Sequence, residues 1–462
     1  MEPVGSVWPG RLFAAAILVA ASTTTVAAQS WPDRLSGHGG PVRSVALSSD
    51  ERHALTASFD YSVVLWAIEG REGRPVHRLL GHEAAANDAR FVSGTRAVSV
   101  GDDGAVILWD LETGNLLSRV DTGEDKTLSL AVSPSGDRIA TASWDRTVRL
   151  YSMEDNRLQQ RALLEGHRGN VNAVVFSHDG KTIFSAASDG VIRAFGAGDG
   201  QLLREVHSHG WGVNVLLRTG MDAQLVFGAV DGTLAVLDTI SGEVEATLSG
   251  HSRPVLALAR SGDGRFFASG GGDGRIQVFD ARTRERIEEY ETPFGPVWGL
   301  SLNIDASVAL HAGLDDFVKV WQVSPRRPFE PADGVYPRRF QANAELEPGE
   351  RQFARKCSVC HTLTPDDGNR AGPTLYGVFG RRAGTLPGYP YSRALVESDL
   401  VWNEKTISDL FDHGPDVVTP GSKMPIQRLK STAERNALVA FLKRATDPNN
   451  QSAPSLERMP TR

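Results

Sequence analysis

Short runs of alternating apolar and polar residues recur in pairs between residues 37 and 322. One such pair is Ile139–Ala142 and Thr147–Tyr151, which are separated by the turn sequence Ser-Trp-Asp-Arg. Alternation with a period of two residues is typical of a strand that buries one face, and turn residues between two such runs predict a hairpin. We therefore expect this stretch of the chain to be all-β.

The predicted hairpins recur at a nearly constant interval. An Asp followed six residues later by a large apolar residue occurs seven times, and successive aspartates lie 42 to 44 residues apart. The seven pairs are Asp60/Trp66, Asp103/Trp109, Asp145/Tyr151, Asp189/Phe195, Asp231/Leu237, Asp273/Phe279 and Asp315/Trp321. Five of these aspartates have a histidine 21 or 22 residues upstream, namely His38, His82, His167, His209 and His251. A fixed period of this length indicates a repeat architecture.

These units resemble the WD40 repeat, in which each unit builds one four-stranded blade of a propeller. The resemblance implies an all-β, seven-bladed propeller over residues 29–323. It also implies a hydrogen-bond network of His, Asp, Ser or Thr, and Trp inside a blade. After Trp321 the proline-containing segment 324–328 is unsuited to form an outer strand. We expect Trp31–Leu35 to supply that strand to the last blade, because a closed ring leaves no exposed edge.

The pattern changes after the repeats. Residues 324–343 contain four prolines and no periodicity, which is typical of an extended linker. From Ala344 a helical pattern begins, with Phe353 and Cys357 on one face. Residues 344–447 are therefore expected to form a small all-α domain, followed by a disordered tail over 448–462. Two separate cores joined by a linker predict that the propeller has little influence on the chemistry of the second domain.

The chain has only two cysteines, and both belong to the sequence Cys357-Ser-Val-Cys360-His361. Two thiols at this spacing on a helical turn reach both vinyl groups of one porphyrin, and the adjacent histidine directs its imidazole at the iron. The pattern is known for covalent haem attachment. Read in isolation, the same five residues also suit a redox-active cysteine pair beside an unrelated histidine.

From Gly349 to Thr446 the chain resembles the small class I cytochromes c. Gly349 and Phe353 match the first helix of that family where it crosses the last one, and Leu438 and Phe441 match the other side of the crossing. The resemblance implies one covalent haem c held by Cys357 and Cys360, with His361 as an axial ligand. It further implies four supporting residues: Pro373 accepts a hydrogen bond from the His361 ring, and Arg381, Tyr391 and Trp402 donate to a haem propionate.

The second axial ligand is expected from a loop on the other side of the haem. The segment Thr419–Pro425 matches the methionine loop of the same family, which makes Met424 the candidate. Met459 lies in the polar tail, and His413 is the competing histidine after His361. A methionine thioether raises the potential of the iron relative to a second imidazole.

The net charge limits the class of partner, and the N-terminal residues predict where the protein is located. A formal net charge of −7 excludes a typical nucleic-acid-binding protein. Arg11, the apolar run Leu12–Ala21 and the small residues before Gln29 predict a cleaved signal peptide over residues 1–28. That run is about half the ~20 residues that span a bilayer, and no other segment is apolar enough. The mature chain is expected to lack a transmembrane segment and to be periplasmic or otherwise exported.

Together these features favour an exported electron carrier over a catalyst. We expect one haem that transfers single electrons between redox protein partners, while the propeller is a docking or scaffold module that offers its face to a protein ligand. No catalytic residue is identified. The alternative, by analogy with other propeller–cytochrome fusions, is a dehydrogenase or reductase with its active site in the propeller. The chain has no second Cys-x-x-Cys-His motif to support that alternative.

Overall fold

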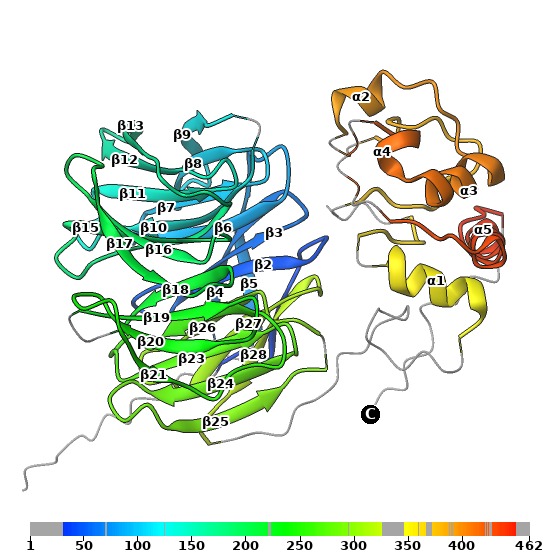
Figure 1. The fold of residues 1–462 in the computed structure, drawn as a ribbon. Coiled ribbons are helices and arrows are strands. Elements are labelled where there is room, and N and C mark those ends of the chain that lie inside the picture. The colour runs from blue at the N-terminus through cyan, green and yellow to red at the C-terminus, as the bar shows by residue number, and fades with distance from the viewer. Residues whose placement is uncertain are drawn as a thin grey trace, which may run out of the picture.

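The computed structural model describes residues 31–325 and 346–449, except 70–71, 124, 220–222, 294, 359, 366–371, 388, 390, 421, 423 and 425–426. The described residues form a β-propeller and a helical domain (residues 346–449), which lie beside each other in Figure 1. The predicted signal peptide and nearly all of the predicted linker and tail lie outside the described residues. None of the described helices is long and apolar enough to cross a membrane.

The propeller consists of seven antiparallel sheets of four strands each. The first three blades are β2 (Val42–Leu47), β3 (His53–Ser58), β4 (Ser62–Glu69) and β5 (Glu72–Leu80); β6 (Ala86–Ser93), β7 (Arg96–Gly101), β8 (Ala105–Asp110) and β9 (Leu116–Asp121); and β10 (Thr127–Val132), β11 (Arg138–Ser143), β12 (Val148–Glu154) and β13 (Arg157–Leu164). The next three are β14 (Val171–Phe176), β15 (Thr182–Ala187), β16 (Val191–Gly196) and β17 (Leu202–Ser208); β18 (Val213–Arg218), β19 (Gln224–Ala229), β20 (Leu234–Asp238) and β21 (Val244–Thr247); and β22 (Val255–Arg260), β23 (Phe266–Gly271), β24 (Arg275–Asp280) and β25 (Arg286–Glu291).

The seventh blade closes the ring with strands from both ends of the propeller. Strands β26 (Gly299–Leu302), β27 (Val308–Ala312) and β28 (Phe317–Gln322) are joined by β1 (Arg34–Ser36), which pairs antiparallel with β28. Leu35 lies opposite Val318 and is fully buried between the blades. The predicted closure is confirmed, and β1 pairs with the edge of β28 that would otherwise be exposed.

The polar network that the resemblance implied is complete in the first two blades. In the first blade His38 bonds to Asp60 through Nδ1 (3.0 Å) and to Thr56 through Nε2 (2.6 Å). The Trp66 indole N–H donates to the same Thr56 hydroxyl at 2.8 Å, and all four side chains are buried. Because each buried donor and acceptor is paired, the network holds the turn between β3 and β4 in one conformation.

The helical domain comprises α1 (Pro348–Lys356), α2 (Arg393–Val396), α3 (Glu404–His413), α4 (Pro415–Val418) and α5 (Thr432–Ala445). Its first and last helices cross where the sequence predicts. A Cβ on Gly349 would lie 2.1 Å from the Ala437 carbonyl oxygen, so only glycine permits this close approach. The Phe353 and Phe441 rings pack beside the crossing with centroids 5.7 Å apart. The core of the domain therefore forms around the α1–α5 contact.

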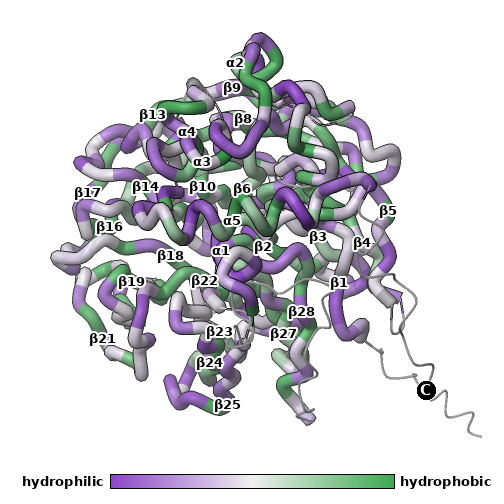
Figure 2. The backbone as a smooth tube through the Cα atoms, turned by 90° about the vertical axis from the view of Figure 1, so that its right-hand side faces the viewer, coloured by the Kyte–Doolittle hydropathy of each residue, from purple (hydrophilic) through white to green (hydrophobic). Residues whose placement is uncertain are grey.

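The helical domain lies over one face of the propeller. Figure 2, which looks from the side of the helical domain, shows α1 and α5 in front of the propeller strands. The face beneath carries the turns between the second and third strands of each blade and the connections between blades. The turns between first and second strands lie on the opposite face, because successive antiparallel strands run in opposite directions.

Candidate functional site

A cavity of about 1190 Å³ lies between the helical domain and the propeller, and we call it the interdomain cavity. All eight residues singled out from the sequence line it: Cys357, Cys360, His361, Pro373, Arg381, Tyr391, Trp402 and Met424. The fold thus gathers residues that are up to 67 positions apart in the chain around one space. Much of the remaining wall on the side of the helical domain is apolar, with Leu375, Val378, Ile407, Leu410, Phe411 and Leu442.

The end of α1 positions His361. The His361 backbone N–H donates to the Cys357 carbonyl at 2.9 Å, which continues the helical turn past the last residue of α1. The ring Nδ1–H donates to the Pro373 carbonyl at 2.7 Å, so the predicted hydrogen bond is present. Burial lowers the pKa of His361 more than this bond raises it. The imidazole is therefore neutral and presents its Nε2 lone pair, as a metal-ligating histidine does.

The two cysteines are not joined in a disulfide, and Cys357 is buried whereas Cys360 is half-buried. Cys357 is 3% exposed, and Cys360 follows it with its N–H bonded to the Cys357 carbonyl at 3.0 Å. Burial raises the pKa of Cys357 to about 12 and that of Cys360 to about 11. Redox-active cysteine pairs have a lowered thiol pKa, and neither thiol is shifted in that direction. The pair fits the alternative use as attachment points.

Met424 and His413 differ in where they lie. Met424 is half-buried, lines the interdomain cavity and packs against the core of the helical domain. Its backbone N–H donates to the Ser422 hydroxyl at 3.1 Å, which fixes the loop locally. His413 is exposed at the end of α3, bonds to the Asp409 carbonyl at 3.3 Å and is not among the residues that line the cavity. Of the two candidates, only Met424 is placed at the cavity.

Arg381, Tyr391 and Trp402 come together on one side of the cavity. The Arg381 guanidinium donates to the carbonyls of Thr374 (2.7 Å) and Tyr376 (3.1 Å), and burial lowers its pKa. The Trp402 backbone pairs with that of Arg381, with Trp402 N–H donating at 3.0 Å. Two of the five Arg381 N–H groups therefore hold the loop that carries Pro373, and the guanidinium as a whole borders the cavity.

The propeller forms the remaining wall of the interdomain cavity. Phe59, Tyr61, Asp102 and Lys126 from the first three blades line it. The two predicted cores are therefore in contact at this site, and the small influence of the propeller on its chemistry stays a prediction. Sequence reasoning missed these residues. One signal was available, since Tyr61 follows the turn Asp at a position where four other units have glycine.

The chain also fits a planar prosthetic group beside His361. A Cβ on Gly372 would lie 2.4 Å from Cε1 of the His361 ring, so glycine is required for the ring to occupy its place at the cavity. The adjoining cavity is lined by two thiols, a thioether and apolar side chains. Two thiols for covalent attachment, one imidazole and one thioether as iron ligands, and an apolar wall are what a c-type haem requires.

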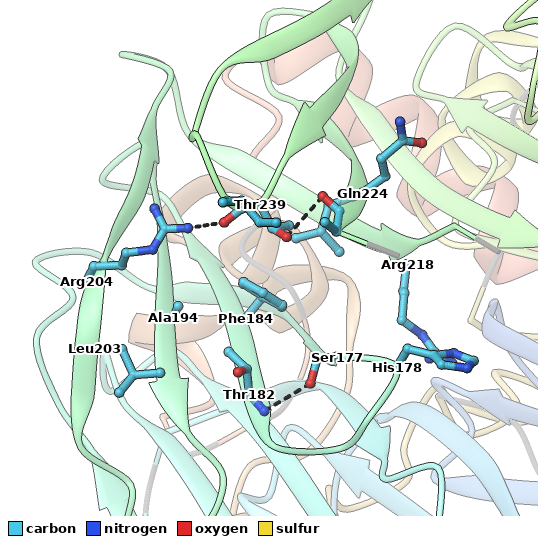
Figure 3. A pocket seen from close by; sticks show the side chains of 13 residues that line it. Ser177, His178, Thr182, Phe184, Ala194, Leu203, Arg204, Arg218, Gln224 and Thr239 are labelled. Carbon is cyan, nitrogen blue, oxygen red and sulfur yellow. Dashed lines mark hydrogen bonds between the residues drawn. The ribbon is translucent and has the colours of Figure 1, made fainter. Parts of the chain in front are cut away.

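A second cavity, of about 380 Å³, lies between the fourth and fifth blades on the opposite face of the propeller (Figure 3). Its two arginines are engaged within the wall: Arg204 donates to the Thr239 carbonyl, and Arg218 bonds to His178 at 2.8 Å. Across the described residues, no group of three or more His, Cys, Asp or Glu is arranged to hold a metal ion. This cavity is remote from the residues singled out above.

Comparisons with known proteins give two family matches. The family model "WD domain, G-beta repeat" matches residues 32–67, 73–110, 117–152, 158–195 and 242–280, so strands β17–β20 and β25–β28 lie outside its segments. The family model "Cytochrome c" matches residues 346–446. Similar relatives include cytochrome c of Sesamum indicum, 42% identical over 102 residues (22% of this chain and 91% of the relative), and cytochrome c of Gibberella zeae, 36% identical over 105 residues (23% and 98%).

Proposed function

Because the chain belongs to the cytochrome c family, we propose that it is an exported carrier of single electrons whose propeller is a docking module. Family membership implies one covalently bound haem c. The observation that carries the proposal is the convergence of Cys357, Cys360, His361 and Met424 on one cavity. Three of these four come from one helical turn, and the fourth comes from a separate loop.

In the proposed site, Cys357 and Cys360 would attach the haem through two thioethers, and His361 and Met424 would bind its iron. The Pro373 carbonyl holds the His361 ring at 2.7 Å, which keeps Nε2 directed at the cavity and increases its basicity. Arg381, Tyr391 and Trp402 are proposed to donate to a propionate. The bound haem supplies an iron that alternates between two oxidation states.

The polypeptide around the haem sets the reduction potential of the iron and holds the ligands His361 and Met424 in place. Apolar residues such as Leu410 and Phe411 exclude water from the cavity, and a low-dielectric surrounding disfavours the more highly charged oxidised state. The Met424 thioether acts in the same direction. With His361 and Met424 both bound to the iron, a substrate would find no open position there, which favours electron transfer over catalysis.

Redox partners are proposed to be proteins, with the propeller offering a second surface to a protein ligand. No nucleic acid is expected, given the net charge of −7. Export by the signal peptide at residues 1–28 is part of the proposal, because covalent haem attachment of this kind takes place outside the cytoplasm. A chain that lacks residues 1–28 is expected to accumulate as apoprotein, whereas the full chain carries haem. Equal haem content in the two proteins, measured by haem staining after denaturing electrophoresis, would overturn this part.

A spectroelectrochemical titration of the full chain tests the carrier function. One transition with the slope of a one-electron couple, ~59 mV per tenfold change in the ratio of oxidised to reduced iron, is expected. A second redox transition would indicate another cofactor and would favour the dehydrogenase or reductase alternative, with its active site in the propeller.

A further inference from the structure

The wall of the interdomain cavity that lies opposite the helical domain is built by propeller turns and connections. These are the turn between β3 and β4, the connection between β5 and β6, the turn between β7 and β8, and the connection between β9 and β10. We call this surface, represented by Phe59, Tyr61, Asp102 and Lys126, the docking face. All four segments belong to the face over which the helical domain lies in Figure 2.

Tyr61 has a left-handed backbone conformation, which is strained for a tyrosine and which other blades satisfy with glycine at this turn position. Its φ is 71°, in the left-handed region that glycine adopts without strain. The equivalent position in four other blades is Gly104, Gly190, Gly232 or Gly274, each with φ between 69° and 90°. A bulky residue in this region is an outlier, and such outliers cluster where a side chain has a function.

The Tyr61 side chain makes the contact that accounts for its presence. It lines the interdomain cavity, and its hydroxyl is hydrogen-bonded to that of Tyr389 in the helical domain. Tyr389 in turn packs edge-on against Tyr391, with ring centroids 4.7 Å apart. The contact therefore runs from a strained propeller turn to one of the residues proposed to support the haem.

The rest of the docking face is held rigidly. The Phe59 ring stacks on Trp298 of the neighbouring blade with centroids 5.5 Å apart. Lys126 forms an ion pair with Asp102, which also accepts a hydrogen bond from Asn87 at 2.8 Å. A preorganised surface loses little conformational entropy when a partner binds. The docking face is therefore preorganised to bind another protein surface.

We propose that the docking face binds the helical domain of the same chain, with Tyr61 as the positioning residue, and that this docking covers the interdomain cavity. The inference rests on the proposed function. A redox protein reaches the covered side only after the two domains separate, whereas a small reductant does not need that separation.

The test compares full-length Tyr61→Gly and Tyr61→Phe with Arg146→Gly. Arg146 is the matched control because it holds the same turn position in the third blade, has φ 75°, is exposed and is not among the residues that line the cavity. Glycine relieves the strain in both turns, so both proteins are expected to fold. Only the loss of Tyr61 removes a contact to the helical domain.

The first readout is amide hydrogen exchange of the connection 83–85, which needs no haem. Exchange there is expected to be about tenfold faster in Tyr61→Gly, the factor that corresponds to about 1.4 kcal/mol of lost docking free energy. Tyr61→Phe should give a smaller acceleration, because it keeps the ring and loses only the hydroxyl. Arg146→Gly should match the wild type. Equal exchange in Tyr61→Gly and wild type would overturn the inference.

The second readout is the rate of haem reduction by a reduced cupredoxin, compared with reduction by ascorbate. The wild-type rate with the cupredoxin should level off at the rate of domain separation, and Tyr61→Gly should raise that limit. Ascorbate reduction should be the same in all variants. A cupredoxin rate that rises linearly with concentration and is unaffected by Tyr61→Gly would contradict covered docking. A chain without a haem spectrum would contradict the proposed function instead, and the exchange readout would still decide the docking.

Discussion

Gly372 and His361 lie so close that a Cβ on the glycine would be 2.4 Å from the histidine Cε1. This closeness lets the Pro373 carbonyl, one residue further on, accept the hydrogen bond from His361 Nδ1. The orientation of the proposed iron ligand thus depends on a residue that has no side chain.

Gly372→Ala is therefore expected to displace the His361 ring. Overpacking of a close-packed interior costs about 1–3 kcal/mol, and we expect that loss in the free energy of unfolding of the helical domain. Thermal unfolding followed at the haem absorbance band measures it. Gly94→Ala is the control, since a Cβ there would meet no atom within 4 Å. An unchanged unfolding temperature for Gly372→Ala would show that the ring has room to move.

Met424→Ala is expected to leave the haem attached but to remove the axial thioether. The potential should fall by on the order of 0.1 V, within the ~0.8 V range over which axial ligands set haem potentials. The weak near-infrared band of a methionine-ligated ferric haem should disappear as well. His413→Ala is the control and should alter neither property. Loss of the low-spin spectrum in His413→Ala, with the band retained in Met424→Ala, would instead identify a bis-histidine iron.

Asp103 links the stability of the propeller to pH. Burial alone would raise the pKa of its carboxyl, but the hydrogen bond and charge of His82 lower it to about 2. A carboxyl with a lowered folded-state pKa contributes stability that is complete above the unfolded value of about 3.9 and is lost as the pH falls towards 2. The contribution at neutral pH is about 2 kcal/mol.

We accordingly expect Asp103→Asn to lower the free energy of unfolding by about 2 kcal/mol at neutral pH. The difference from wild type should shrink as the pH falls from about 4 to about 2. Urea unfolding of the full chain at several pH values measures this, and Glu112→Gln, an exposed residue of the same blade, is the control. A difference that stays constant down to the lowest pH would mean that the carboxylate charge is not the stabilising feature.

The sequence predicts most of the fold because its determinants are local and repeated. The turn aspartates at intervals of 42 to 44 residues mark seven hairpins, and in four of them the Asp bonds to a buried histidine: His38/Asp60, His82/Asp103, His167/Asp189 and His251/Asp273. The α1–α5 crossing is likewise visible, because Gly349 and Phe353 lie one helical turn apart. Short-range patterns report these features directly.

The interdomain cavity was predicted on only one of its two sides. Tyr61 and Tyr389 are 328 residues apart, and no periodicity connects a propeller turn with a loop of another domain. The linker prolines suggested independence of the two cores, yet the structure places them in contact. The one local sign of that contact in the sequence was Tyr61, which stands after the turn Asp where four other units have glycine.

If Cys357 and Cys360 hold one haem, the intact mass of the secreted protein should equal that of the polypeptide plus one haem. A pyridine haemochrome spectrum of the same sample should identify that haem as haem c. No covalent haem is expected in the double variant Cys357→Ser/Cys360→Ser. A polypeptide mass reduced by the two hydrogens of a disulfide, or increased by two haems, would contradict the attachment of one haem.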